Sequence, residues 1–219
     1  MDFTPKKLPK NWHLKFRNFI TSDGYTVVIA KKPADKEKLV TRLVEENDLI
    51  LRSENPDSPF VLLKTSNQLG ETALKEAVEY AAAHCVQWND KLENTDVYCI
   101  KPGQLSKAIP SGEQLAKGYF FVNGDKKIFD KTGVKLSIGV KIDGQGNAVL
   151  ISGPVMAVRK SSDYFLTLLP GSNASETFAE EIKRRLLLKA LPEHKAGIEK
   201  IQNEEVFNHL PKGTVNVAE

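Results

Sequence analysis

Basic and aromatic side chains alternate near the start of the chain, and this is the first pattern that suits a chemical task. Lys15 and Arg17 flank Phe16, and Phe19 follows just before the turn sequence Ser22-Asp23-Gly24. Cations beside aromatic rings suit a polyanion with flat bases, because cations attract phosphates while rings stack on bases. The spacing alone favours a second interpretation, in which the rings belong to the core of a structural hairpin. Lys15 and Arg17 are candidates for backbone phosphate contact, and the structural alternative stays open.

Two further groups of lysines occur in segments rich in proline and glycine. Lys107 precedes residues 108–112, whose proline and glycine favour a rigid loop that would hold a basic group in a fixed place. Lys126 and Lys127 follow Asn123-Gly124-Asp125, a strong signal for a tight turn between two strands. All three lysines are candidates for phosphate contact. The plain alternative is that they are solvated loop lysines.

Catalytic groups are thinly represented. The four histidines form no cluster, and there is no P-loop, GxGxxG, nucleophile elbow or metal-spaced His/Glu set. Asp23, Asp48 and Asp57 could form an acidic metal site, but a turn explains Asp23 and the start of a strand explains Asp48. Cys85 and Cys99 lack CxxC or Cys/His spacing, which predicts small core residues rather than zinc ligands. We therefore expect a protein that is not an enzyme and holds no metal or other cofactor.

Charge is distributed in blocks along the 219-residue chain. The formal net charge of +3 hides +5 over residues 1–32, −6 over 33–99, +6 over 100–160 and −2 over 161–219. If the two basic blocks meet in space, they form a positive face on a nearly neutral protein. Lysine-rich loops often serve only solubility, so charge alone leaves polyanion binding open.

No segment predicts a membrane protein or a secreted one. The chain has no apolar run of about 18 residues, and residues 1–11 are polar and rich in lysine. We expect a cytoplasmic protein with no membrane partner.

The elements that must position these groups alternate strands with a few helices. The apolar patterns predict a hairpin over 12–20 and 25–31, a helix from Pro33 to about Glu46, short strands at 48–51 and 60–64, the longest helix over 70–88, rich in alanine, a strand at 97–100, an ordered loop over 101–118, and a second hairpin of 119–122 with 126–129. Together they predict an α+β fold, in which a mixed, mainly antiparallel sheet carries the long alanine-rich helix.

After residue 131 the pattern changes, and we expect a second unit. Strands at 136–142, 147–151, 155–158 and 164–169 would form a β-meander, followed by helices over 175–189, from Pro192 and over 204–209, and by a frayed tail from Pro211. The predicted units are residues 1–131, as the binding domain, and residues 132–219, as a β-meander with a helical extension.

From Trp12 to about Phe129 the chain resembles NFACT-R, the RNA-binding domain of NFACT proteins. These include eukaryotic ribosome-quality-control factors of the NEMF type and bacterial factors like fibronectin-binding protein A. The likeness is carried, in order, by Phe16 to Tyr25, Asp48-Leu49-Ile50-Leu51, the alanine-rich stretch Leu69 to Trp88, and Ser106-Lys107-Ala108-Ile109-Pro110-Ser111-Gly112, followed by Gly118-Tyr119-Phe120 and Gly124-Asp125-Lys126-Lys127.

The chain departs from the family pattern at two positions. After the strand that begins with Asp48 the family usually has a histidine, and a second one follows about eight residues later. Arg52 and Phe60 occupy these places here, so any role of the histidines is in doubt. Arg52 could still grip a phosphate, and its permanent charge would make that grip independent of pH.

The resemblance implies a cytoplasmic, non-catalytic protein that binds tRNA or ribosomal RNA in translation or ribosome quality control, with the large ribosomal subunit as an expected partner. Residues 134–171 resemble the carboxy-terminal extension of stand-alone family members found mainly in archaea. The expected RNA-binding residues are Lys107, Lys126, Lys127, Arg17, Arg52 and Lys15.

Two alternatives stay open. The chain could be a protein-interaction adaptor for a ribosomal or tRNA-modification partner, or a subunit of a tRNA-modifying enzyme. The sequence leaves the oligomeric state, the identity of the RNA and the role of the extension open.

Overall fold

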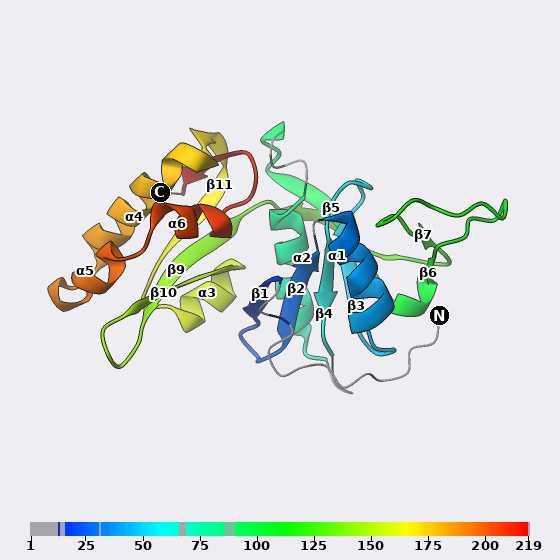
Figure 1. Ribbon diagram of the computed structural model, residues 1–219, viewed down its shortest axis with the longest axis horizontal. Helices are drawn as coiled ribbons and strands as arrows, with labels where there is room; N and C mark the ends of the chain where they lie inside the picture. The colour runs from blue at the N-terminus through cyan, green and yellow to red at the C-terminus, as the bar shows by residue number, and fades with distance from the viewer. Residues whose placement is uncertain are drawn as a thin grey trace.

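The computed structural model describes residues 13, 16–30, 32–65, 69–85, 88 and 90–218. These residues form two larger antiparallel sheets that lie next to each other along the long axis of the molecule, with helices on their faces (Figure 1). A short two-stranded sheet projects at the side of the first one. The predicted α+β class is confirmed, although every strand pair in the described residues is antiparallel rather than mixed.

The first sheet has six strands. In spatial order they are β1 (Arg17–Ile20), β2 (Thr26–Ala30), β4 (Phe60–Leu63), β3 (Leu49–Ser53), β5 (Asn94–Ile100) and β8 (Lys127–Gly133). The first predicted hairpin is confirmed over its described residues, with Phe19 opposite Val27. Gly24 closes its turn at a φ of 96°, a value that residues with a Cβ rarely adopt.

The two faces of this sheet are covered by different helices (Figure 1). Successive strand residues point to opposite faces, so each strand contributes to two cores. One core joins Leu51, Val61 and Val97 to α2 (Glu71–Ala83), whose alanines pack closely on the strands. The other core joins Ile50, Phe60, Leu62 and Tyr98 to the π-helical turn η2 (Leu39–Leu43), which continues α1 (Pro33–Lys38) on the same side. We call this second side the α1 face.

Both predicted helices of this part end earlier than expected. The first stops at Leu43, because the Val44 N–H bonds the Leu39 carbonyl and Val44 itself is extended. The carboxylate of Asp48 then accepts the Glu45 N–H and fixes the chain on its way into β3. The second helix stops at Ala83, so the longest described helix is α4 (Ser175–Lys189) instead.

The second predicted hairpin is wrong. The segments on either side of residues 123–125 do form strands, but they pair with different partners. β7 (Phe121–Val122) pairs with β6 (Leu105–Ser106), which follows the 3-10 turn η4 (Pro102–Gln104), whereas β8 pairs with β5. The Gln104 side chain holds the turn by donating to the carbonyls of Asn123 and Asp125. Of the predicted loop over 101–118, residues 102–106 instead form η4 and β6, and the prediction holds for residues 107–118.

The second larger sheet has four strands in the order β10 (Ala148–Gly153), β9 (Leu136–Ile142), β11 (Tyr164–Ala174) and β12 (Thr214–Val217). The predicted meander is wrong in two respects. Residues 155–158 belong to a helix, α3 (Val155–Ser161), and β11 lies beside β9 rather than β10. A run of four apolar residues fits a strand or a helix equally well, and Pro154 ends the preceding strand and caps this helix.

The helices of this part follow the sequence more closely. α4, α5 (Pro192–Glu199) and α6 (Asn203–His209) are confirmed, and they enclose a separate core against the four strands. The expected frayed tail is wrong, because β12 pairs with β11 along residues 214–217. No helix in the described part of the chain combines the length and the apolar character that crossing a bilayer requires.

Specific contacts join the two larger sheets. The Arg17 guanidinium donates to the Leu210 carbonyl at 2.7 Å, and the Trp88 indole donates to the Thr214 carbonyl at 2.9 Å. A largely apolar cavity of about 330 Å³ lies between β1, β10, α3 and His209. Val134 and Leu136, which connect the sheets, belong to the α2-side core. The division into units at residue 131 stays a prediction.

Candidate nucleic-acid interface

Arg52 lies on the α1 face, in a row of side chains that crosses three neighbouring strands. It is paired with Tyr98 of β5, and Phe60 of β4 lies on its other side. The guanidinium carbon is 5.1 Å from the centre of the Phe60 ring and 5.3 Å from that of Tyr98. The guanidinium therefore rests against two aromatic rings, an arrangement that favours a cation.

The Arg52 side chain is nearly enclosed, yet its hydrogen-bonding capacity is not used up. The residue is 8% exposed, and its Nη1 donates to the Pro56 carbonyl at 3.3 Å. Its Nε is buried without a hydrogen-bond partner, and so is the hydroxyl of Tyr98. Buried polar groups in native proteins are nearly always satisfied, so two such atoms side by side indicate a place for a ligand or ordered water.

Lys36 of α1 adds a second enclosed cation. It is 5% exposed, its Nζ lies 5.8 Å from the centre of the Phe60 ring, and it reaches the Asp57 carbonyl at 3.5 Å. Burial and then the charge of Arg52 lower the pKa of Lys36, while the Asp57 carboxylate acts in the opposite direction. We did not predict Lys36 from the sequence. Its signal was helical spacing, since it lies three and four residues before Leu39 and Val40 on the apolar side of the helix.

Lys126 and Lys127 lie on opposite faces of the sheet. Lys126 is on the α1 face, where its Nζ is 4.5 Å from the centre of the Tyr98 ring and 3.8 Å from Glu54. Lys127 is paired with Cys99, which belongs to the α2-side core, and lies over Phe129 at 5.1 Å. They are not at a hairpin tip, because the chain enters β8 here. We call Lys36, Arg52, Phe60, Tyr98 and Lys126 the Arg52 cluster.

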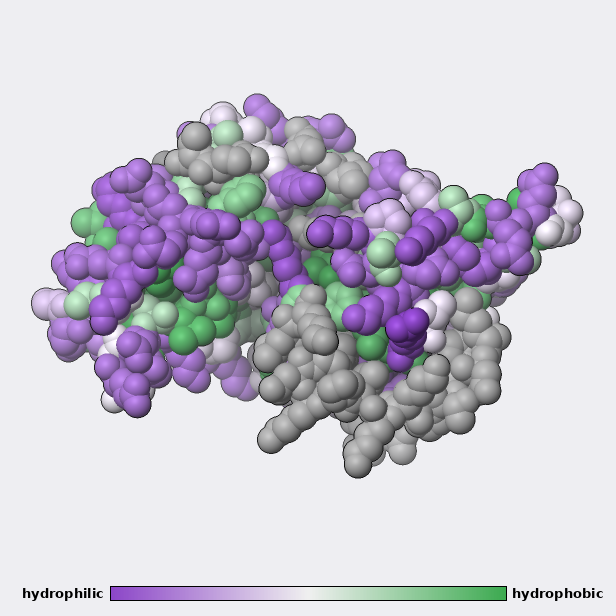
Figure 2. Space-filling model, in the orientation of Figure 1, coloured by the Kyte–Doolittle hydropathy of each residue, from purple (hydrophilic) through white to green (hydrophobic). Residues whose placement is uncertain are grey.

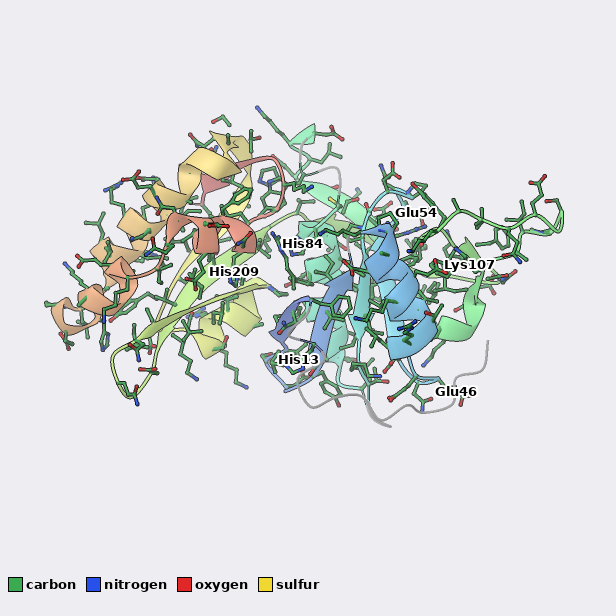
Figure 3. All side chains as sticks on the ribbon, viewed as in Figure 1. His13, Glu46, Glu54, His84, Lys107 and His209 are labelled. Carbon is green, nitrogen blue, oxygen red and sulfur yellow. The ribbon has the colours of Figure 1, made fainter. Side chains whose placement is uncertain are left out.

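Lys107 is also on this side of the sheet (Figure 3), with its Nζ 4.6 Å from the centre of the Phe120 ring, but its ammonium group is fully engaged. It donates to Glu37 at 3.1 Å and to the carbonyls of Ala116 and Tyr119 at 2.9 and 3.1 Å. An ammonium has three N–H donors, so all are used. Burial alone would raise the pKa of Glu37, but the Gly118 N–H and Lys107 hold it below its ordinary value. Lys107 therefore ties the loop over residues 107–119 to α1.

The edge of the Arg52 cluster is aromatic and polar. Tyr119 is 41% exposed, and its hydroxyl donates to the Asp57 carboxylate at 3.1 Å. This bond raises the pKa of Tyr119. Ile128, paired with Tyr98, is 44% exposed on the same face. Hydrophilic residues predominate over α1 and the projecting β6–β7 segment in the view of Figure 2.

Arg17, another predicted site residue, lies elsewhere. Arg17 is at the contact between the two larger sheets, where burial lowers its pKa and Tyr80 acts against that. Lys15 lies outside the described residues. The structure thus brings Arg52, Lys107 and Lys126 to one face and separates Arg17 and Lys127 from them.

The three aspartates considered for a metal site are dispersed into structural roles. Asp48 accepts from Lys64 and from the Thr65 N–H, and Asp23 accepts from the Thr21 hydroxyl and the Ala73 N–H. Within the described residues no group of three or more His, Cys, Asp or Glu side chains could hold a metal ion.

Comparison with known proteins identifies relatives. The model of the NFACT protein RNA-binding domain matches residues 15–124. The archaeal Rqc2 homolog aRqcH of Methanocaldococcus jannaschii is 26% identical over 181 residues, which are 81% of this chain and 27% of that protein. The ribosome quality control complex subunit NEMF homolog of Drosophila melanogaster is 31% identical over 117 residues, which are 52% of this chain and 12% of that protein.

The chain therefore spans about a quarter or less of the length of these relatives. The first alignment is longer than the predicted 131-residue unit, so the likeness reaches into the second sheet. A solved structure of the carboxy-terminal part of the fibronectin/fibrinogen-binding protein of Streptococcus suis aligns with a TM-score of 0.46 at 15% identity, covering 59% of this chain and 49% of that one. From the match over residues 15–124, the chain belongs to the NFACT protein RNA-binding domain family.

Proposed function

We propose that the chain binds RNA through the α1 face of its six-stranded sheet and acts in ribosome quality control. Family membership supports RNA binding, and the names of the relatives associate those proteins with ribosome quality control. We choose this face because it holds two enclosed cations, Lys36 and Arg52. Among the described residues, neither has a carboxylate within ion-pair distance.

The proposed mechanism is electrostatic capture with recognition of shape. Lys36, Arg52 and Lys126 would attract phosphates, and the exposed ring of Tyr119 would offer a surface on which a base can stack. Selection by shape and backbone suits a structured RNA such as tRNA or ribosomal RNA. The large ribosomal subunit is the proposed setting for this contact.

The six predicted site residues take different parts in this proposal. Arg52 and Lys126 would contact RNA directly, and Lys107 would position the loop that borders them. Lys127 would contact RNA only if the ligand wraps around the β8 edge. The guanidinium of Arg17 bonds a carbonyl between the sheets, and contact by Lys15 stays a prediction.

Salt dependence tests the proposal. Because each neutralised phosphate releases counterions, affinity for a tRNA should fall steeply between about 50 and 200 mM salt. Fluorescence anisotropy of the full chain with labelled tRNA and with a ribosomal RNA fragment measures this slope. Weak binding at low salt, or affinity that does not change with salt, would contradict the proposal.

The adaptor alternative rests on a separate observation. Leu188, near the end of α4, and Leu191, just before α5, are 70% and 53% exposed, and large exposed apolar side chains are a feature of protein contacts. Under this alternative, charge reversal at Lys126 would leave recovery of a protein partner unchanged. Under the RNA proposal, the same change would weaken RNA binding.

A further inference from the structure

We propose that the Arg52 cluster is a recess for a phosphomonoester, the group found at a phosphorylated end of an RNA chain. The inference rests on the proposed function in one respect, namely that the phosphate belongs to an RNA. It goes beyond that function because it distinguishes an RNA end from the phosphodiester backbone.

The first step is the charge of the recess. Lys36 and Arg52 both lie against the ring of Phe60, and both are more than nine-tenths buried. Two enclosed like charges repel each other, and an uncompensated buried charge is costly. Burial lowers the pKa of Lys36, and the charge of Arg52 adds to that shift. An anion seated between the two cations would relieve the repulsion.

The nearby carboxylates offset these charges only in part, since Asp57 acts on Lys36 without forming an ion pair with it. Asp57 accepts a hydrogen bond from the Tyr119 hydroxyl at 3.1 Å, and Glu54 lies 3.8 Å from Lys126. Each of these carboxylates thus has its own partner at the edge of the cluster. Arg52 has neither carboxylate within ion-pair distance, so its charge remains available to a ligand.

The second step is the geometry of the donors. Nη1 of Arg52 donates to the Pro56 carbonyl, and the other side of the guanidinium, formed by Nε and Nη2, faces the proposed ligand. Nε is buried without a hydrogen-bond partner. This side of a guanidinium can donate two parallel hydrogen bonds to two oxygens of one phosphate. The buried Tyr98 hydroxyl lies close enough to the Arg52 guanidinium to interact with it, and it borders the same side.

The third step is access, which selects an end over the backbone. With Arg52 at 8% and Lys36 at 5% exposure, a ligand must enter the cluster to reach them. An internal phosphodiester carries a nucleoside on both sides, whereas a terminal phosphate is open on one side. A phosphomonoester also carries about two negative charges near neutral pH, which matches two cations better than the single charge of a diester.

The test uses the full chain and one short RNA sequence in three forms, with a 5′-phosphate, with a 3′-phosphate, or with hydroxyls at both ends. We expect one phosphorylated form to bind about tenfold more tightly than the hydroxyl form, a gain typical of charge-assisted hydrogen bonds. The form that gains identifies the end. If all three bind within about twofold of one another, the proposal is overturned.

Two variants connect the effect to the recess. Arg52→Lys keeps the charge but removes the Nε–Nη2 side, and Lys36→Gln removes the second cation. Both should abolish the preference for the phosphorylated end. Lys141→Gln, on the second larger sheet, should keep it. A preference that survives in both recess variants would overturn the proposal.

A measurement on the unaltered chain tests the proposal even if the variants fail to fold. The Arg52 Nε–H resonance should shift in NMR spectra as inorganic phosphate or adenosine monophosphate is added, and an unchanged resonance would overturn the proposal. Equal binding of the three RNAs would exclude a phosphomonoester site at the Arg52 cluster, but it would not contradict the proposal that the chain binds RNA. If the Arg52 Nε–H resonance shifts on addition of phosphate but the chain binds none of the RNAs, the recess is supported and the proposed function is contradicted.

Discussion

Basic residues of similar appearance in the sequence have different surroundings in the molecule. Arg52 keeps an unpartnered Nε beside two aromatic rings, whereas the ammonium of Lys107 is shared among one carboxylate and two carbonyls. The Arg17 guanidinium donates a hydrogen bond to the Leu210 carbonyl at the contact between the sheets. The sequence identifies which residues are cations, but the partners that occupy them come from distant segments.

At this scale we expect Lys107→Gln to lower stability. The change removes a charged donor with three partners, and such losses cost about 1–3 kcal/mol. Thermal unfolding of the full chain measures the effect. Lys117→Gln, an exposed lysine of the same loop, is the matched control and should melt as the unaltered chain does. Equal stability of the two variants would show that Lys107 does not hold the loop.

Single elements position the cluster. The loop over residues 107–119 approaches α1 closely at Gly118, where the backbone has a φ of 83° and a Cβ would lie 2.5 Å from Cα of Pro33. The Gly118 N–H also donates to Glu37 at 2.9 Å. This close approach sets the border of the α1 face next to Tyr119.

We therefore expect Gly118→Ala to destabilise the chain more than Gly112→Ala. Both glycines have positive φ, but an added Cβ at Gly112 would meet nothing within 4 Å. Gly112→Ala should cost about 1 kcal/mol for its backbone conformation alone. Urea unfolding compares the two variants. A difference below a few tenths of a kcal/mol would show that the approach to Pro33 is not tightly packed.

Elements also show what the sequence could and could not predict. The first hairpin and α2 were predictable because Asp23-Gly24 and the alanine spacing are local signals. The pairing of β7 with β6, and of β12 with β11, depends on segments far apart in the chain, which no local pattern specifies. The predicted strand over residues 155–158 was wrong because a run of four apolar residues has neither the period of a helix nor that of a strand.

The candidate site was predictable only in part. Arg52 stood out because it replaces a family histidine, and Lys126 because of its turn. Adjacent strand residues point to opposite faces, so Lys126 and Lys127 had to diverge, but which face each one takes follows from the pairing of β8 with β5. Lys36 was missed because a lysine on an apolar helix stripe is usually assumed to reach solvent.

The whole molecule depends on the contact between its two larger sheets. His209 of α6 lies at this contact, hydrogen-bonded to the Ser152 hydroxyl at 3.0 Å and near Arg17. Burial and then the charge of Arg17 lower the pKa of His209 to about 4. His209 is therefore neutral in the folded chain at neutral pH.

Stability should consequently fall as the pH falls from about 6.5 to about 4. In that range the unfolded chain binds a proton at His209 that the folded chain does not, so acid favours unfolding by up to about 3 kcal/mol. Unfolding in urea at several pH values measures this. His209→Asn should flatten the profile over this range, and an unchanged profile would show that His209 does not govern it.

The central claim, that RNA lies on the α1 face, is tested most directly by two neighbouring charge reversals. Lys126→Glu and Lys127→Glu change adjacent, exposed lysines that face opposite sides of the same strand. We expect Lys126→Glu to weaken tRNA binding about tenfold and to reduce the salt slope by about one, with Lys127→Glu within about twofold of the unaltered chain. Thermal unfolding confirms that both variants are folded. Equal losses in the two variants, or a larger loss in Lys127→Glu, would contradict the account.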